Sequence, residues 1–151
     1  MSTFERRPQA SPENSTLQTV VEISAAQIVS TAAGNLGHAA GVPLVPDPGA
    51  GKMIELVSLV FKYTRLTASY TGGGNITVNT RGGTALTGAI SAANSLLNAA
   101  SRLYLMVPLA ASGTLFVENR GLNLVSSAAF TNSGSAAGTL KIIVNYRIIN
   151  L

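Results

Sequence analysis

The sequence predicts an all-β fold, a jelly-roll-like β-sandwich of about eight antiparallel strands with an extended N-terminal arm. Alternating or continuously apolar stretches recur along the chain, and turns rich in Gly, Pro, Asn and Ser separate them. Only Ala92–Ala100 has the composition of an α-helix. No repeat of fixed period is present, so neither a solenoid nor a propeller is expected.

Length and composition define the domains and the class of protein. The 151 residues fit one domain, which we divide into an arm (1–16) and a sandwich domain (17–151). Only 11% of the residues are charged, so much of the surface is weakly polar and suited to burial against other protein. The chain has no Cys, which excludes disulfides and thiolate metal sites. We expect no secretory signal, membrane span or cofactor.

The longest strand is expected at Lys52–Tyr63, after the turn Pro46–Gly51. A helical template fits this stretch too, but its β-branched residues and the lack of an N-cap favour a strand. Strict alternation divides its apolar residues between two sides, so we expect burial on both faces, at the centre of the sandwich. One side holds Met53, Val57, Leu59, Phe61 and Tyr63, and the other holds Ile54, Leu56 and Val60.

The remaining elements follow from alternation and turn signals. Ser24–Ile28 is expected to form one helical turn capped by Ser24. Loops are expected at Gly34–Gly41, Thr71–Asn75 and Thr131–Gly138. The other strands are expected at Leu17–Ile23, Val42–Pro46, Thr64–Tyr70, Ile76–Thr80, Ala85–Ile90, Arg102–Pro108, Thr114–Arg120, Leu122–Ser126 and Leu140–Ile149.

Candidate catalytic and metal-binding residues are sparse. Pro48–Lys52 lacks the first Gly and the final Ser or Thr of a phosphate-binding loop, and it precedes a strand rather than a helix. His38 is the single histidine, so a surface loop position is expected rather than a zinc site or a triad. Glu55 and Glu118 could pair as in a glycosidase, but we expect Glu55 to pair with a basic residue such as Arg147 or to face a subunit contact. No catalytic residue is therefore predicted.

Candidate binding residues lie in the basic and polar loops and in the arm. The net charge is +4, but the basic residues after the arm are spaced singly, unlike a nucleic-acid footprint. The group Asn79, Thr80 and Arg81 suits either a sugar-binding loop or an ordinary hairpin end. In the arm, Phe4 is the expected apolar anchor and Arg6 and Arg7 are the polar clamps. The arm either packs along its own domain or reaches a neighbour.

Three features carry a family resemblance: the turn Pro46–Lys52 before the long strand, the turn Tyr70–Ile76, and the closing strand through Val144–Ile148. In this order they resemble small all-β proteins encoded among the structural genes of tailed bacteriophages, including capsid decoration (cement) proteins. The resemblance covers about Leu17 to Leu151. It implies a homotrimeric sandwich on the capsid exterior of the virion that bridges adjacent major capsid proteins.

The expected function is therefore non-enzymatic: a decoration protein that binds and stabilises the shell of the major capsid protein. The partners expected are that protein and copies of the chain, with no nucleic acid, membrane or small-molecule substrate. The alternative is a receptor- or glycan-binding module associated with a tail or head fibre. That alternative calls for exposed aromatic residues, and Tyr70 and Phe130 are the two in expected loops.

Overall fold

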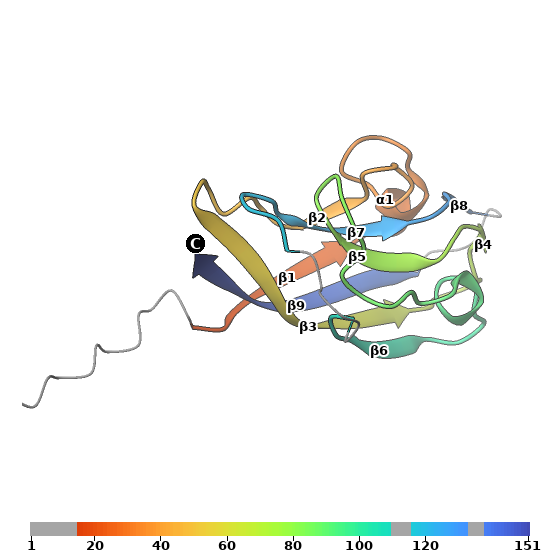
Figure 1. The fold of residues 1–151 in the computed structure, drawn as a ribbon. Helices are drawn as coiled ribbons and strands as arrows, with labels where there is room; N and C mark the ends of the chain where they lie inside the picture. The colour runs from red at the N-terminus through yellow and green to blue at the C-terminus, as the bar shows by residue number, and fades with distance from the viewer. Residues whose placement is uncertain (1–14, 110–115, 133–137) are drawn as a thin grey trace, which may run out of the picture.

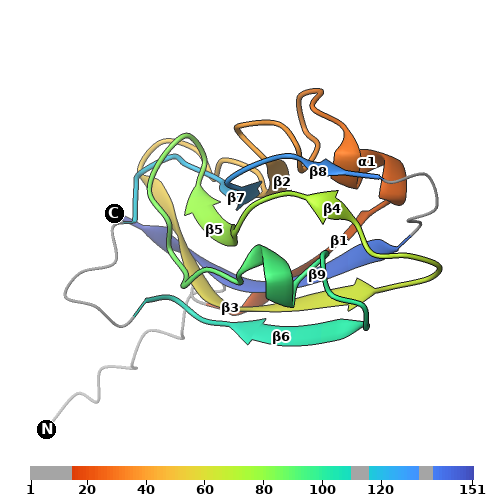
Figure 2. The same ribbon diagram turned by 90° about the vertical axis from the view of Figure 1, so that its right-hand side faces the viewer.

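A computed structural model describes residues 15–109, 116–132 and 138–151. Its larger layer is a four-stranded antiparallel sheet with the order β1-β9-β3-β6 (Figures 1 and 2). These strands are β1 (Leu17–Ile23), β9 (Thr139–Asn150), β3 (Lys52–Thr64) and β6 (Arg102–Met106). Two long strands, β3 and β9, therefore form the middle of this sheet, and β1 and β6 form its edges.

The opposite layer contains a three-stranded antiparallel sheet with the order β2-β7-β5, formed by β2 (Val42–Val45), β7 (Leu122–Ser126) and β5 (Ile76–Thr80). A third pair, β4 (Thr71–Gly72) and β8 (Phe130–Thr131), extends the same side of the molecule (Figure 2). The core lies between the layers and draws its buried apolar side chains from both of them. The predicted all-β sandwich is confirmed.

A bulge in β3 decides which of its side chains enter the core. The pairing of β3 with β9 shifts register between Leu56 and Ser58, so one extra residue reverses the alternation. The residues before and after the bulge therefore share the inner face, where Ile54, Leu56, Leu59, Phe61 and Tyr63 are all buried. The predicted division of these residues between two sides is wrong. So is burial on both faces, because Val60 is half-buried and Lys62 exposed.

The helical turn forms where predicted. Helix α1 (Ala25–Val29) begins after Ser24, whose hydroxyl accepts a hydrogen bond from the Gln27 amide at 3.3 Å. The Gln27 side chain in turn accepts one from the Ser24 amide at 3.0 Å, which completes a capping box. This cap anchors the turn that leads from β1 towards the opposite layer, and Ile28 fixes it there by complete burial.

Four predicted elements differ in the structure. The helix expected over Ala92–Ala100 is only the 3₁₀ turn η2 (Ala92–Asn94), followed by turns and bends. The strand expected from Thr64 to Tyr70 is absent: β3 ends at Thr64, and residues 65–70 form no strand. Within 85–90 only isolated bridges form. The strand expected over Thr114–Arg120 begins outside the described residues, and its described part, 116–120, is not a strand but includes a turn. Small or turn-forming residues make up most of 64–70 and 85–90 and give little side-chain surface to pack on a sheet. The Asn and Ser residues within 92–100 favour turns over a helix.

Candidate binding face on the four-stranded sheet

The outer face, meaning the side of the four-stranded sheet that points away from the opposite layer, carries an apolar row across all four strands. Strand register places Val20 beside Ile143, Ile143 beside Val60, and Val60 beside Leu105. Val20 is 48% exposed and Leu105 69%, whereas the two central side chains are half-buried. Directly opposite side chains on one face contact each other, so this row is a continuous apolar stripe.

A polar row lies next to the apolar row and is hydrogen-bonded along the sheet. The Gln18 amide nitrogen donates to Asn145 Oδ1 at 3.0 Å, and Asn145 Nδ2 donates to Ser58 Oγ at 3.1 Å. The three side chains thus satisfy part of one another's hydrogen-bonding capacity. These hydrogen bonds remain when a partner protein covers the row. Covering the row therefore costs less free energy than covering polar groups that have lost water and gained no partner.

The charged groups of the outer face are also mostly paired within the sheet. Lys141 Nζ lies 3.3 Å from Glu22 Oε1, and Arg147 Nη1 lies 3.4 Å from Glu55 Oε2. The predicted pairing of Glu55 with Arg147 is confirmed. Lys62 lies beside Lys141 in the register and forms no ion pair with any residue the structure describes. Lys62 is therefore the cation of this face that is open to an external carboxylate.

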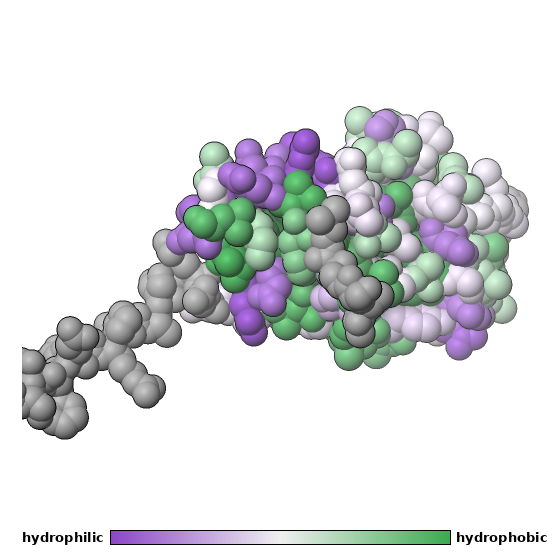
Figure 3. Space-filling model, viewed as in Figure 1, coloured by the Kyte–Doolittle hydropathy of each residue, from purple (hydrophilic) through white to green (hydrophobic). Residues whose placement is uncertain are grey.

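Strand β6 forms one edge of this face and is unusually apolar on its outer side. Leu103 and Leu105 are each 69% exposed, and Val107, just beyond the strand, is 54% exposed. Figure 3 shows hydrophobic side chains gathered along the lower edge of the molecule, where β6 runs in Figure 1. Single exposed apolar residues are ordinary, but a contiguous group of them marks an interaction site.

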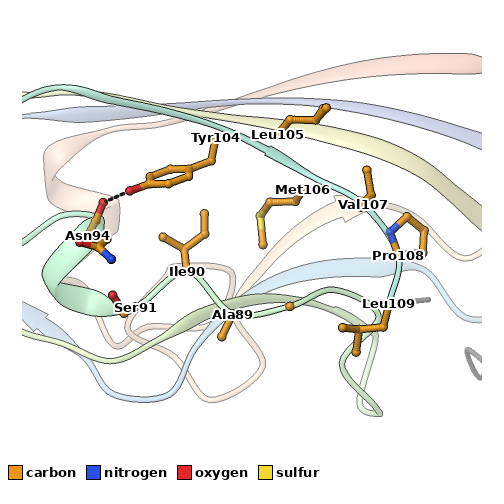
Figure 4. Close-up of a pocket in the computed structure, with 11 residues that line it drawn as sticks. Ala89, Ile90, Ser91, Asn94, Tyr104, Leu105, Met106, Val107, Pro108 and Leu109 are labelled. Carbon is orange, nitrogen blue, oxygen red and sulfur yellow. Dashed lines mark hydrogen bonds between the residues drawn. The ribbon is translucent and has the colours of Figure 1, made fainter. Parts of the chain in front are cut away.

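A groove of about 490 Å³, the edge groove, lies between β6 and residues 88–91. Figure 4 shows Tyr104 and Met106 pointing from β6 towards Ile90, whereas Leu105 and Val107 lie on the other side of the strand. One end is bounded by the hydrogen bond from the Tyr104 hydroxyl to the Asn94 carbonyl at 2.8 Å. The other end is bounded by a bridge between Thr87 and Pro108. The described lining holds no Lys, Arg, His, Asp or Glu.

The Pro46–Lys52 segment is a structural turn that leads into β3, as predicted. Gly49 and Gly51 have φ angles of 99° and 71°, which glycine adopts without strain. Asp47 forms an ion pair with Arg81, and its other oxygen accepts from the Gly121 amide at 2.6 Å. These contacts use the polar groups of the turn to attach it to neighbouring loops rather than to form an anion site.

The other ionisable candidates are occupied by local contacts. His38 lies in a loop, as predicted, and its Nδ1 accepts a hydrogen bond from the Ala40 amide at 3.1 Å. Glu118 does not lie on a strand as expected; its Oε1 accepts from the Gly51 amide at 2.7 Å. Glu55 is engaged by Arg147. In the part of the chain that the structure describes, no three His, Cys, Asp or Glu side chains gather as metal ligands would.

The polar residues of the expected sugar-binding loop are engaged within the protein: Arg81 pairs with Asp47, and the other two are bonded locally or buried. Asn79 Oδ1 accepts from the Thr77 hydroxyl at 2.7 Å, and Thr80 is buried. Tyr70 and Phe130, the aromatic residues expected in exposed loops, are each 1% exposed. They fill the core because the short β4–β8 pair carries this part of the chain over the end of the sandwich.

The arm residues Phe4, Arg6 and Arg7 lie outside the described residues. Of the outer face, the sequence indicated only Glu55, which was expected to pair with a basic residue or to face a subunit contact, although a stronger signal was present in two strands. Alternation in Arg102–Pro108 placed Leu103, Leu105 and Val107 on one side, and Ile143 interrupted the mixed side of the last strand. What the sequence could not supply was the register that brings these residues together. Among the helices of the described residues, none is long and apolar enough to cross a membrane.

Comparison of the chain with models of known protein families, with curated proteins and with solved structures finds no match. Two classes of site remain for the described residues: a docking face on the four-stranded sheet and the edge groove beside it.

Proposed function

We propose that this chain is a non-enzymatic structural protein that docks onto a larger protein assembly through the outer face. Its specific role would be that of a capsid decoration protein, as the sequence resemblance implies. In that role it binds the exterior of a shell of major capsid protein and stabilises the contacts between shell subunits.

The apolar row Val20–Ile143–Val60–Leu105 is the observation that carries this proposal. A row of this kind gains free energy when another protein covers it, roughly 25 cal/mol per Å² of apolar surface removed from water. The neighbouring polar and charged groups oppose covering only weakly because most are already paired along the sheet. The face is therefore suited to docking on protein, whereas a glycan site would need exposed aromatic rings that the described loops do not present.

The test is binding to shells assembled from the major capsid protein without this chain, measured by co-sedimentation and by the thermal stability of the shell. Val20→Lys and Val60→Lys place a charge in the apolar row, and we expect each to weaken binding at least about tenfold. Leu66→Lys is the matched control, since Leu66 is 61% exposed but lies just after β3, outside the row. Equal binding by all the variants, or none by the unmodified chain, would refute the proposal.

A further inference from the structure

We propose that β6 is a self-association edge. In this arrangement β6 of one copy pairs antiparallel with β6 of a second copy about a two-fold axis through Tyr104. The two four-stranded sheets then become one eight-stranded sheet. This inference is independent of shell binding and concerns the edge of the sheet rather than its face.

The two edges of the four-stranded sheet differ in how well they are protected from pairing. Native proteins protect an open strand edge with charges, prolines or bulges that discourage pairing. Strand β1 has Glu22 among its outward residues. β6 has one charge, Arg102 at its first position; over Leu103–Met106 it has neither charge nor proline, and no described strand pairs with its open side. An edge of this composition leaves its backbone groups available to a partner strand.

The surface beside β6 favours one kind of partner strand. The edge groove beside β6 has no charged side chain in its described lining, so a strand with charges facing it would lose their hydration without compensation. An uncharged strand with apolar side chains on both faces avoids that loss. β6 itself is such a strand from Leu103 to Met106, with Tyr104 and Met106 on one face and the two leucines on the other. Arg102, at the start of β6, is exposed and would lie at the end of the pairing, where it keeps contact with water.

Strand β6 is also self-complementary. The central residues Leu103-Tyr104-Leu105 read the same in both directions, so a two-fold axis at Tyr104 places Leu103 opposite Leu105 of the second copy, twice. Beyond Met106, where β6 ends, Pro108 is already bridged to Thr87 of the same chain. A register centred on Tyr104 keeps the new pairing within Arg102–Met106 and so avoids that bridge.

The size of the contact sets its strength. Five paired residues span roughly 17 Å, which covers less area than the ~800 Å² per partner of a typical stable complex. We therefore expect a dimer that forms with rising concentration and dissociates on dilution. Pairing would set Leu105 of each copy beside Leu103 of the other, so the apolar rows of the two copies would meet at the new strand pair with an offset of two residues.

The first test is light scattering of the full chain across a dilution series. We expect a reversible monomer–dimer equilibrium. The double variant Leu103→Lys/Leu105→Lys sets lysines opposite lysines in both pairs, and it should raise the Kd of the dimer at least about tenfold. Both positions are 69% exposed, so the thermal midpoint should not change. Val20→Lys, on the other edge strand, is the matched control and should keep the equilibrium.

The second test uses the absence of native cysteine. Leu103→Cys and Leu105→Cys chains are oxidised each alone and as a mixture. Directly opposite Cβ atoms lie ~4.5–5.5 Å apart and diagonal ones ~7–8 Å apart, whereas a disulfide needs roughly 3.5–4.5 Å. Efficient cross-linking is therefore expected in the mixture and much less in either variant alone. Val20→Cys is the control for random collision.

Two results would overturn the proposal. One is a chain that stays monomeric at every concentration. The other is an oligomer, including the trimer implied by the resemblance, that persists in the double lysine variant or shows no preference for the mixed cross-link. Loss of shell binding with retention of the dimer in Val20→Lys would separate the docking face from the self-association edge.

Discussion

Among single residues, the buried Tyr70 has the clearest effect on how stability depends on pH. Its hydroxyl donates a 2.5 Å hydrogen bond to the Gly138 carbonyl, and its ring packs near that of Tyr63 at 6.4 Å. Burial, with a smaller contribution from Tyr63, raises the pKa of Tyr70 to about 12. Burial also raises the pKa of Tyr63, partly offset by the charge of Arg65. The fold thus favours the neutral phenol at both positions.

The first prediction is a loss of stability at alkaline pH. The ordinary pKa of tyrosine is 10.0, so the unfolded chain releases the Tyr70 proton at lower pH than the folded chain does. The stabilisation is complete below about pH 10 and is lost as the pH rises from about 10 towards 12. Urea unfolding at a series of pH values measures this effect, and phenolate absorbance follows the ionisation. Tyr70→Phe should be less stable at neutral pH but lose less over the same range. An equally steep loss in Tyr70→Phe would contradict the assignment.

Single residues differ in how far sequence reasoning can place them. The pairing of Glu55 with Arg147 was predictable because a carboxylate within an apolar strand needs a partner. The burial of Tyr70 and Phe130 was not, because both border glycine- and serine-rich stretches that read as exposed turns. Only the path of the chain over the sandwich shows that these rings fill the core.

Among the secondary-structure elements, β9 depends on a glycine, Gly138, immediately before its first residue. A Cβ atom added at Gly138 would lie 2.6 Å from Cε2 of Tyr63 and 2.9 Å from the Thr64 carbonyl oxygen. The carbonyl belongs to the backbone at the end of β3 and cannot move without disturbing the β3–β9 pairing. Close approach of the two chains therefore requires glycine at this position.

The second prediction is that Gly138→Ala destabilises the fold by about 1–3 kcal/mol, the usual cost of forcing an extra methyl group into a packed site. Gly88→Ala is the matched control. The nearest atom to its added Cβ is Leu109 Cδ2 at 3.9 Å, and Gly88 has no left-handed φ angle. Gly88→Ala should change the free energy of unfolding by less than about 0.5 kcal/mol. Urea unfolding of both variants checks this, and equal losses would mean that crowding at Gly138 is unimportant.

Strands were predictable where alternation was long or turn signals were sharp. The segments Leu17–Ile23, Ile76–Thr80 and Leu122–Ser126 match the structure at both ends. The bulge in β3 was not predictable, because nothing in Leu56-Val57-Ser58 marks an extra residue and only the partner strand reveals the shift. For the same reason the candidate face was not assembled from the sequence: its rows exist only through register, which pairs residues more than eighty positions apart, such as Val60 and Ile143.

At the scale of the whole molecule, apolar surface is distributed unequally between the two sides of the larger sheet. The inner side forms the core, which runs in sequence from Ile23 to Val144. The outer side retains a second, smaller set of apolar side chains that the described residues do not cover. This arrangement is typical of a sheet that packs on something at both faces, and it connects the fold with the proposed docking role.

The last prediction concerns the N-terminal arm. Among the described residues, every buried apolar side chain lies at or after Ile23 and the core is complete without the arm, so deletion of residues 1–14 should leave the thermal midpoint nearly unchanged. If Phe4, Arg6 and Arg7 contact the assembly, the same deletion should weaken shell binding by about tenfold or more. Hydrogen bonds to charged groups contribute roughly 1.5–3 kcal/mol each, and two would be lost with the arginines.

Arg6→Ala/Arg7→Ala keeps the length of the arm and tests its charges separately; Lys141→Ala, a change of one paired cation on the outer face, provides the comparison. Calorimetry and shell co-sedimentation give the two readouts independently. An unchanged midpoint with weaker binding would make the arm a second contact beside the outer face. A thermal midpoint lowered by many degrees in the deletion variant would instead make the arm part of the fold. If the deletion variant binds shells as well as the full chain does, docking depends on the outer face alone.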